Sequence, residues 1–76
     1  MKSNDVIAVF SQNMKELRIQ KGLTQEELSF KAGIHRNYIS DTERGRRNVS
    51  LKAVEKIAQG LDVTIQELFS NSTIIK

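Results

Sequence analysis

Residues 23–45 read LTQEELSFKAGIHRNYISDTERG, and this stretch contains two short helical patterns separated by a glycine. Thr24, followed three residues later by Glu27, forms a capping box, which is a start signal for a helix. Gly33 stands where the first pattern ends, a position typical of helix C-termini. The stretch therefore predicts two short helices joined by a tight turn, with the second helix at 36–43.

The second of these helices has a polar face without long aliphatic side chains. Ile39 and Thr42 point to the opposite side of the helix. Five polar side chains fall within one arc of about 140°: Arg36, Asn37, Ser40, Asp41 and Arg44. Their groups match base edges, because arginine pairs with guanine, asparagine with adenine, and a carboxylate accepts from cytosine. Two short helices with a glycine turn form a helix-turn-helix arrangement, and we predict that the second helix reads DNA.

Residues on both sides of this helix suit the phosphate backbone. Gln25 lies in the first turn of the preceding helix, where its amide and the free backbone N–H groups can meet a phosphate oxygen. Tyr38 is either a DNA contact or a half-buried flanking residue, and Asp41 either accepts from cytosine or tunes the helix surface. Further phosphate contacts are expected after the helix: Arg46, Arg47, Asn48, Ser50 and Lys52.

The rest of the chain also follows a helical period, and no segment alternates as a strand does. We therefore predict an all-α protein with five short helices and one domain over 1–76, comprising a core at about 5–69 and a tail at 70–76. Cap residues precede the last three helices: His35, Ser50 and Thr64. The remaining core stripes are Val6, Phe10, Met14 and Leu17; Leu51, Val54, Ile57, Ala58 and Leu61; and Ile65, Leu68 and Phe69.

Composition narrows the function classes. The 76 residues carry 12 Lys and Arg against 9 Asp and Glu, so the net charge is +3. Cysteine is absent, which excludes a disulfide scaffold, a thiolate metal site and a cysteine nucleophile. Glu26 and Glu27 are adjacent and point about 100° apart on a helix, so they do not converge as a catalytic pair. We expect no enzyme activity, no cofactor and no small-molecule ligand. No apolar run reaches the roughly 20 residues of a membrane helix, so the expected location is the cytoplasm.

Three stretches carry a family resemblance: LTQEEL at 23–28, RNYISDTERG at 36–45 and GLDVTI at 60–65. They resemble the Cro/C1-type (XRE) helix-turn-helix family, and the match covers about residues 14–69. The run RGRRNVSL at 44–51 is most similar to the controller proteins of bacterial restriction–modification systems, although phage-type repressors share much of it. The resemblance implies a compact five-helix, lambda-repressor-like domain. It also implies a homodimer that binds a near-palindromic operator and controls its own promoter and restriction–modification genes.

The same resemblance implies roles for individual residues. It suggests that Arg18 and Glu43 form a partly buried ion pair that orients the reading helix. Glu26 either complements the helix dipole or contacts RNA polymerase beside a promoter. Thr is common in controller proteins where Asn37 stands, and Asp41 is also unusual at its position, so the operator sequence stays open. The family places at the DNA surface Gln25, Arg36, Asn37, Tyr38, Ser40, Arg44, Arg47 and Asn48.

A dimer interface is expected around the fifth helix and the tail. The tail is mostly polar but contains two isoleucines, which we expect to be buried. They can pack either against a second subunit or against the helices of their own subunit. The expected interface residues are Ile65, Leu68, Phe69, Ile74 and Ile75. A rival class is a protein-binding module, an antitoxin or adaptor whose arginines bind an acidic partner. Binding to duplex DNA with a steep salt dependence would favour the DNA-binding class over the protein-binding class.

Overall fold

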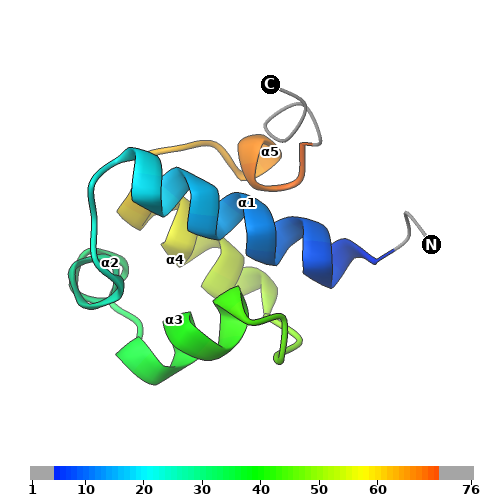
Figure 1. Ribbon diagram of the computed structural model, residues 1–76, viewed down its shortest axis with the longest axis horizontal. Helices are drawn as coiled ribbons and strands as arrows, with labels where there is room; N and C mark the ends of the chain where they lie inside the picture. Colours follow the sequence, from blue (N-terminus) through cyan, green and yellow to red (C-terminus); the bar gives the residue numbers. More distant parts are fainter. Residues whose placement is uncertain (1–4, 71–76) are drawn as a thin grey trace.

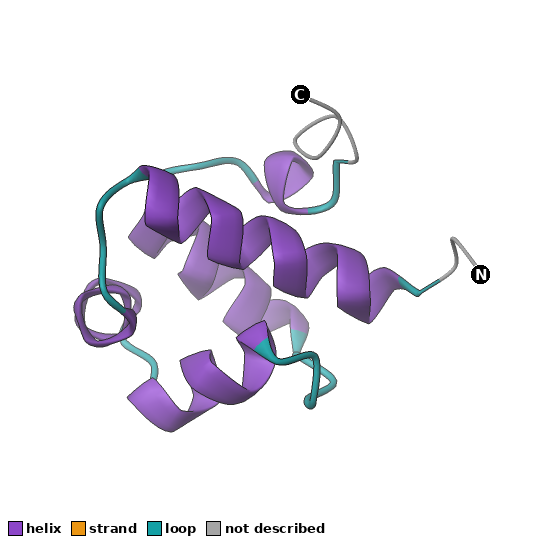
Figure 2. Ribbon diagram, in the orientation of Figure 1, coloured by secondary structure: helices purple, strands orange, loops and turns teal. Residues whose placement is uncertain are grey.

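The computed structural model describes residues 5–70, which form five helices and no strand (Figures 1 and 2). The predicted all-α class is therefore confirmed for the part of the chain that the structure describes. None of these helices is long and apolar enough to cross a membrane. The helices are α1 (Val6–Gln20), α2 (Gln25–Ala32), α3 (Arg36–Glu43), α4 (Leu51–Leu61) and α5 (Ile65–Leu68).

Side-chain caps begin the helices where the sequence places them. Thr24 Oγ1 accepts from the Glu27 N–H at 3.0 Å, and the Glu27 carboxylate accepts from the Thr24 N–H at 2.8 Å. Thr64 and Glu67 form the same reciprocal box at the start of α5. Ser50 starts α4, because its hydroxyl accepts from a backbone N–H three residues on. Each cap satisfies donors that the first helical turn otherwise leaves free, so local sequence determines where these helices begin.

The core lies between α1, α2 and α4, with α3 and α5 closing it on two sides (Figure 1). Four predicted core positions are exposed: Val6 is 55%, Leu51 is 86%, Ile65 is 48% and Phe69 is 38% exposed. Val6, Leu51 and Ile65 are each the first residue of a helix, at the end of an apolar stripe. The main buried cluster consists of Phe10, Met14, Leu17, Leu28, Ala32, Ile39, Val54, Ile57, Ala58, Leu61 and Leu68.

Helices α2 and α4 approach closely at Gly60, which lies inside α4 near its C-terminal end. A Cβ at this position would lie 3.0 Å from the Ala32 backbone nitrogen and 3.0 Å from Leu28 Cδ1. These distances are tighter than ordinary van der Waals contact, so a side chain here would push against α2, and glycine serves the close contact rather than a turn. The close contact fixes α2 against α4, and α2 in turn sets the position of the turn that leads into α3.

Candidate nucleic-acid interface

The connection between α2 and α3 is a tight turn closed by two backbone hydrogen bonds. Gly33 has a positive φ of 69° and ends α2 in the left-handed conformation. The N–H groups of Gly33 and Ile34 both donate to the Ser29 carbonyl, at 2.9 and 3.1 Å. His35 then starts α3, because its Nδ1 accepts from the Asn37 N–H at 3.1 Å. The predicted cap at His35 is confirmed, and the turn holds α3 at a fixed angle to α2.

Helix α3 presents the predicted face to solvent. Ile39 is 0% and Thr42 is 1% exposed, so these side chains anchor the inner side of the helix. The Thr42 hydroxyl also donates to the Tyr38 carbonyl at 2.7 Å. The outer side carries hydrogen-bonding groups that are exposed at Arg36, Asn37 and Arg44 and half-buried at Ser40 and Asp41. Helix α3 is therefore packed on the core through its inner side and presents a polar outer side to solvent.

A partly buried ion pair connects α1 to the last residue of α3, as the family resemblance implies. Arg18 Nε donates to Glu43 Oε2 at 2.6 Å, and a second guanidinium nitrogen donates to Glu43 Oε1 at 3.1 Å. The two side chains are 12% and 3% exposed. Arg18 also donates to the Leu23 carbonyl at 2.7 Å, so one guanidinium orders α1, the loop before α2 and the end of α3.

Gln25 has a structural partner that the sequence did not predict. Its Nε2 donates to Glu43 Oε1 at 3.0 Å, which adds a third donor to the same carboxylate. The side chain therefore braces α2 against α3. Gln25, Glu26 and Arg36 line one shallow hollow beside the start of α2. A phosphate contact by the remaining amide hydrogen stays a prediction.

The loop after α3 folds back onto α3 through Arg47. Its guanidinium lies over the Tyr38 ring at 4.3 Å from the centroid and pairs with Asp41 Oδ2 at 3.3 Å. The Tyr38 hydroxyl accepts from the Ser50 N–H at 3.4 Å, at the start of α4. Tyr38 is half-buried, as one of the two sequence interpretations holds. Sequence reasoning missed the contact between Arg47 and Asp41.

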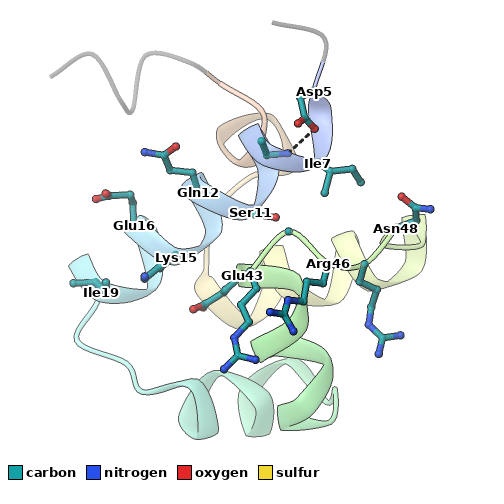
Figure 3. A pocket seen from close by; sticks show the side chains of 14 residues that line it. Asp5, Ile7, Ser11, Gln12, Lys15, Glu16, Ile19, Glu43, Arg46 and Asn48 are labelled. Atoms are coloured by element: carbon teal, nitrogen blue, oxygen red, sulfur yellow. Dashed lines mark hydrogen bonds between the residues drawn. The ribbon is translucent and has the colours of Figure 1, made fainter. Parts of the chain in front are cut away.

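A groove of about 800 Å³ separates α1 from the same loop (Figure 3). Lys15 lies on the α1 side, and Arg46 and Asn48 lie on the loop side. Within residues 5–70, Ser11 Oγ is buried without a hydrogen-bond partner, and it would lie 3.8 Å from a Cβ on Gly45. The loop backbone therefore passes directly beside α1, and the loop arginines lie next to the end of α3.

The expected dimer surface is only partly available. Ile65 is 48% and Phe69 is 38% exposed, and Phe69 also packs on Phe10 with ring centroids 5.2 Å apart. Leu68 is 0% exposed, so its predicted place in the core is confirmed and its predicted place in the interface is wrong: α5 turns it into the core of its own subunit. The other expected interface residues, Ile74 and Ile75, lie outside the described residues.

Two helices joined by a left-handed turn, with a polar second helix beside an arginine-rich loop, define a helix-turn-helix domain. A helix-turn-helix family model matches residues 14–68, and the chain belongs to this family. The control protein C.BamHI of Bacillus amyloliquefaciens is 42% identical over 73 residues, which cover 95% of this chain and 90% of that protein.

Solved structures agree with this assignment. The restriction–modification controller protein C.AhdI from Aeromonas hydrophila is 48% identical, with a TM-score of 0.80 over 83% of this chain and 96% of that chain. The controller C.Esp1396I has been solved as a tetramer in complex with its natural 35 base-pair operator. That structure is 35% identical and has a TM-score of 0.76 over 91% of this chain and 100% of that chain. The five-helix fold is therefore shared with restriction–modification controllers.

Proposed function

We propose that this chain is a sequence-specific DNA-binding transcriptional regulator that controls restriction–modification genes and its own promoter. The observation that carries the proposal is the α3 surface, where exposed arginine and asparagine side chains stand on an anchored helix beside a cationic loop. Similarity to a controller solved on its operator supports the same function. The chemistry is recognition rather than catalysis.

In this proposal α3 enters the major groove and reads base edges. Arg36 and Asn37 occupy the first turn of α3, and Ser40 follows one turn later on the same face. These side chains are the readers, because guanidinium and amide groups discriminate guanine and adenine by paired hydrogen bonds. The positioning contacts to phosphate come from the flanks: Gln25, Tyr38, Arg44, Arg46, Arg47, Asn48, Ser50 and Lys52.

The regulator acts as a homodimer on a two-fold-related operator. Two copies place their α3 helices in successive major grooves about 34–36 Å apart, which is one turn of DNA. Ile65 and Phe69 supply the apolar surface for the contact between subunits, since both are large, exposed and close together on and beside α5. A two-fold dimer uses the same patch on both subunits, so one substitution changes the interface twice.

Replacing Ile65 with aspartate is expected to weaken the dimer by about 2 kcal/mol or more, roughly thirtyfold in dissociation constant. The substitution places one carboxylate from each subunit in the apolar contact, where the two charges repel each other and lose hydration. Sedimentation velocity across a concentration series measures the change. Gln66→Asp is the matched control, because it adds the same charge one residue along α5 at an exposed polar position. Equal dissociation constants for the two variants would show that the dimer interface does not include Ile65.

Glu26 is the proposed contact to RNA polymerase. Its side chain is exposed on α2 and has no ion-pair partner within residues 5–70. The neighbouring Glu27 carboxylate is instead occupied by its capping box with Thr24. Phe30, one turn along the helix, is 88% exposed. We infer that this acidic and apolar side of α2 faces polymerase when the dimer lies beside a promoter.

Salt titration of DNA binding tests the proposed function. Four cations per subunit flank the exposed face of α3: Arg44, Arg46, Arg47 and Lys52. They give the dimer about eight phosphate contacts, or about six where Arg47 does not reach phosphate. We expect affinity for duplex DNA to fall by about 10³–10⁵ between roughly 50 and 200 mM salt. Fluorescence anisotropy with labelled duplexes measures the slope. An absence of binding at low salt would contradict the proposal and favour the protein-binding class.

A further inference from the structure

Asp41 is an unexpected residue on a surface that is proposed to meet DNA. It lies on the half-buried edge of the α3 face, with a side chain that is 40% exposed. A carboxylate there approaches a polyanion, and like charges at close range oppose binding. Its contribution to DNA binding therefore depends on what it contacts within the protein.

The partner of Asp41 is Arg47, which is one of the proposed phosphate contacts. The ion pair measures 3.3 Å, and the same guanidinium stacks on the Tyr38 ring at 4.3 Å. The Tyr38 hydroxyl in turn accepts from the Ser50 N–H at 3.4 Å. The guanidinium therefore has a defined position in the free protein, held by the Asp41 carboxylate and the Tyr38 ring, both on α3.

The ion pair between Asp41 and Arg47 contributes little stability, so Arg47 can exchange Asp41 for another anion. The Asp41 and Arg47 side chains are 40% and 41% exposed, so water and salt reach the ion pair, and exposed pairs contribute little to folding. A phosphate oxygen is a chemical equivalent of the carboxylate as a partner for arginine. DNA phosphate and Asp41 thus compete for the same guanidinium.

We propose that Asp41 is a specificity-determining residue that acts by competing with DNA phosphate for Arg47. This inference rests on the proposed DNA-binding function. On random sequence, Asp41 retains Arg47 and the complex lacks that phosphate contact. On the operator, the full set of base contacts draws Arg47 onto phosphate, and a cytosine amino group facing Asp41 replaces its lost partner. Asp41 therefore lowers affinity for wrong sequences more than for the operator.

The test replaces Asp41 with asparagine, which keeps the shape of the side chain and removes the charge. Two probes are used, a random-sequence duplex and the duplex selected from a random library. We expect about tenfold tighter binding to the random duplex and less than about threefold change on the selected one. The salt slope on random duplex becomes steeper by about 0.9 per subunit, because one more phosphate is contacted.

Asp62→Asn is the matched control, because it removes the same charge beyond the far end of α4. Asp62 is exposed and has a φ of 59°, a left-handed conformation that asparagine accepts. The effect of Asp41→Asn should also vanish in an Arg47→Ala background. Equal gains in the two Asp→Asn variants, or a gain that persists without Arg47, would overturn the inference. If the wild-type protein binds neither duplex, the proposed DNA-binding function is contradicted as well.

Discussion

Replacing Glu43 with alanine is expected to cost about 3–5 kcal/mol of unfolding free energy, because it leaves Arg18 partly buried without its ion-pair partner. Glu43 is 3% exposed and accepts three hydrogen bonds, two from Arg18 and one from Gln25. All three donors lose their acceptor at once. The carboxylate also connects α1 and α2 to the end of α3, so the substitution loosens the reading helix as well.

Urea denaturation followed by circular dichroism measures this loss, and the melting temperature should fall by about 4–8 °C per kcal/mol. Glu55→Ala is the control, since Glu55 pairs with Lys52 at 3.2 Å on the surface, where the side chains are 48% and 73% exposed. Exposed pairs of this kind contribute about 0.2–1 kcal/mol. Similar stability losses in the two variants would contradict a structural role for the pair between Arg18 and Glu43.

Alanine at Arg36 or at Asn37 is expected to cost about 1–3 kcal/mol of operator-binding free energy, a loss of roughly 5- to 160-fold in affinity. Each substitution removes a group that is proposed to discriminate one base. The preference at a single base-pair position should therefore relax, while binding to random duplex changes little. Competition binding against a set of operators with single base changes measures both effects.

Lys52→Ala provides the comparison for a phosphate contact. Lys52 is highly exposed at the start of α4, and we expect its loss to weaken all duplexes alike and to reduce the salt slope by about one unit per subunit. If Arg36→Ala instead weakens the operator and the random duplex equally, Arg36 is a phosphate contact and not a reader. Circular dichroism confirms that each variant remains folded.

The helices and the exposed polar face of α3 could be predicted because their signals are local. A capping box such as that of Thr24 specifies a helix start within four residues, and helical spacing is enough to turn Ile39 inward and Arg36 outward. Neither inference needs knowledge of the rest of the chain. The ion pair between Arg18 and Glu43 joins residues 25 positions apart, so local spacing does not predict it, and the family resemblance does.

The remaining features depend on how distant segments meet. Helical spacing alone predicts Leu51 in the core, although no described segment covers the start of α4. The interface predicted at Leu68 is wrong because α5 buries this side chain completely. The close approach of α2 favours glycine at position 60, and the sequence of α4 by itself does not reveal this contact. The pairing of Asp41 with Arg47 depends on the path of the loop after α3, which sequence spacing leaves undetermined.

Selection of binding sites from a random duplex library tests most directly whether a dimer reads bases through α3. The proposed geometry predicts enrichment of one near-palindromic sequence whose half-site centres lie one helical turn apart, about 34–36 Å. Arg36→Ala should then lose enrichment at one symmetric pair of positions. A library that shows no enriched sequence, or an enriched sequence that Arg36→Ala leaves unchanged, would contradict base reading by this helix.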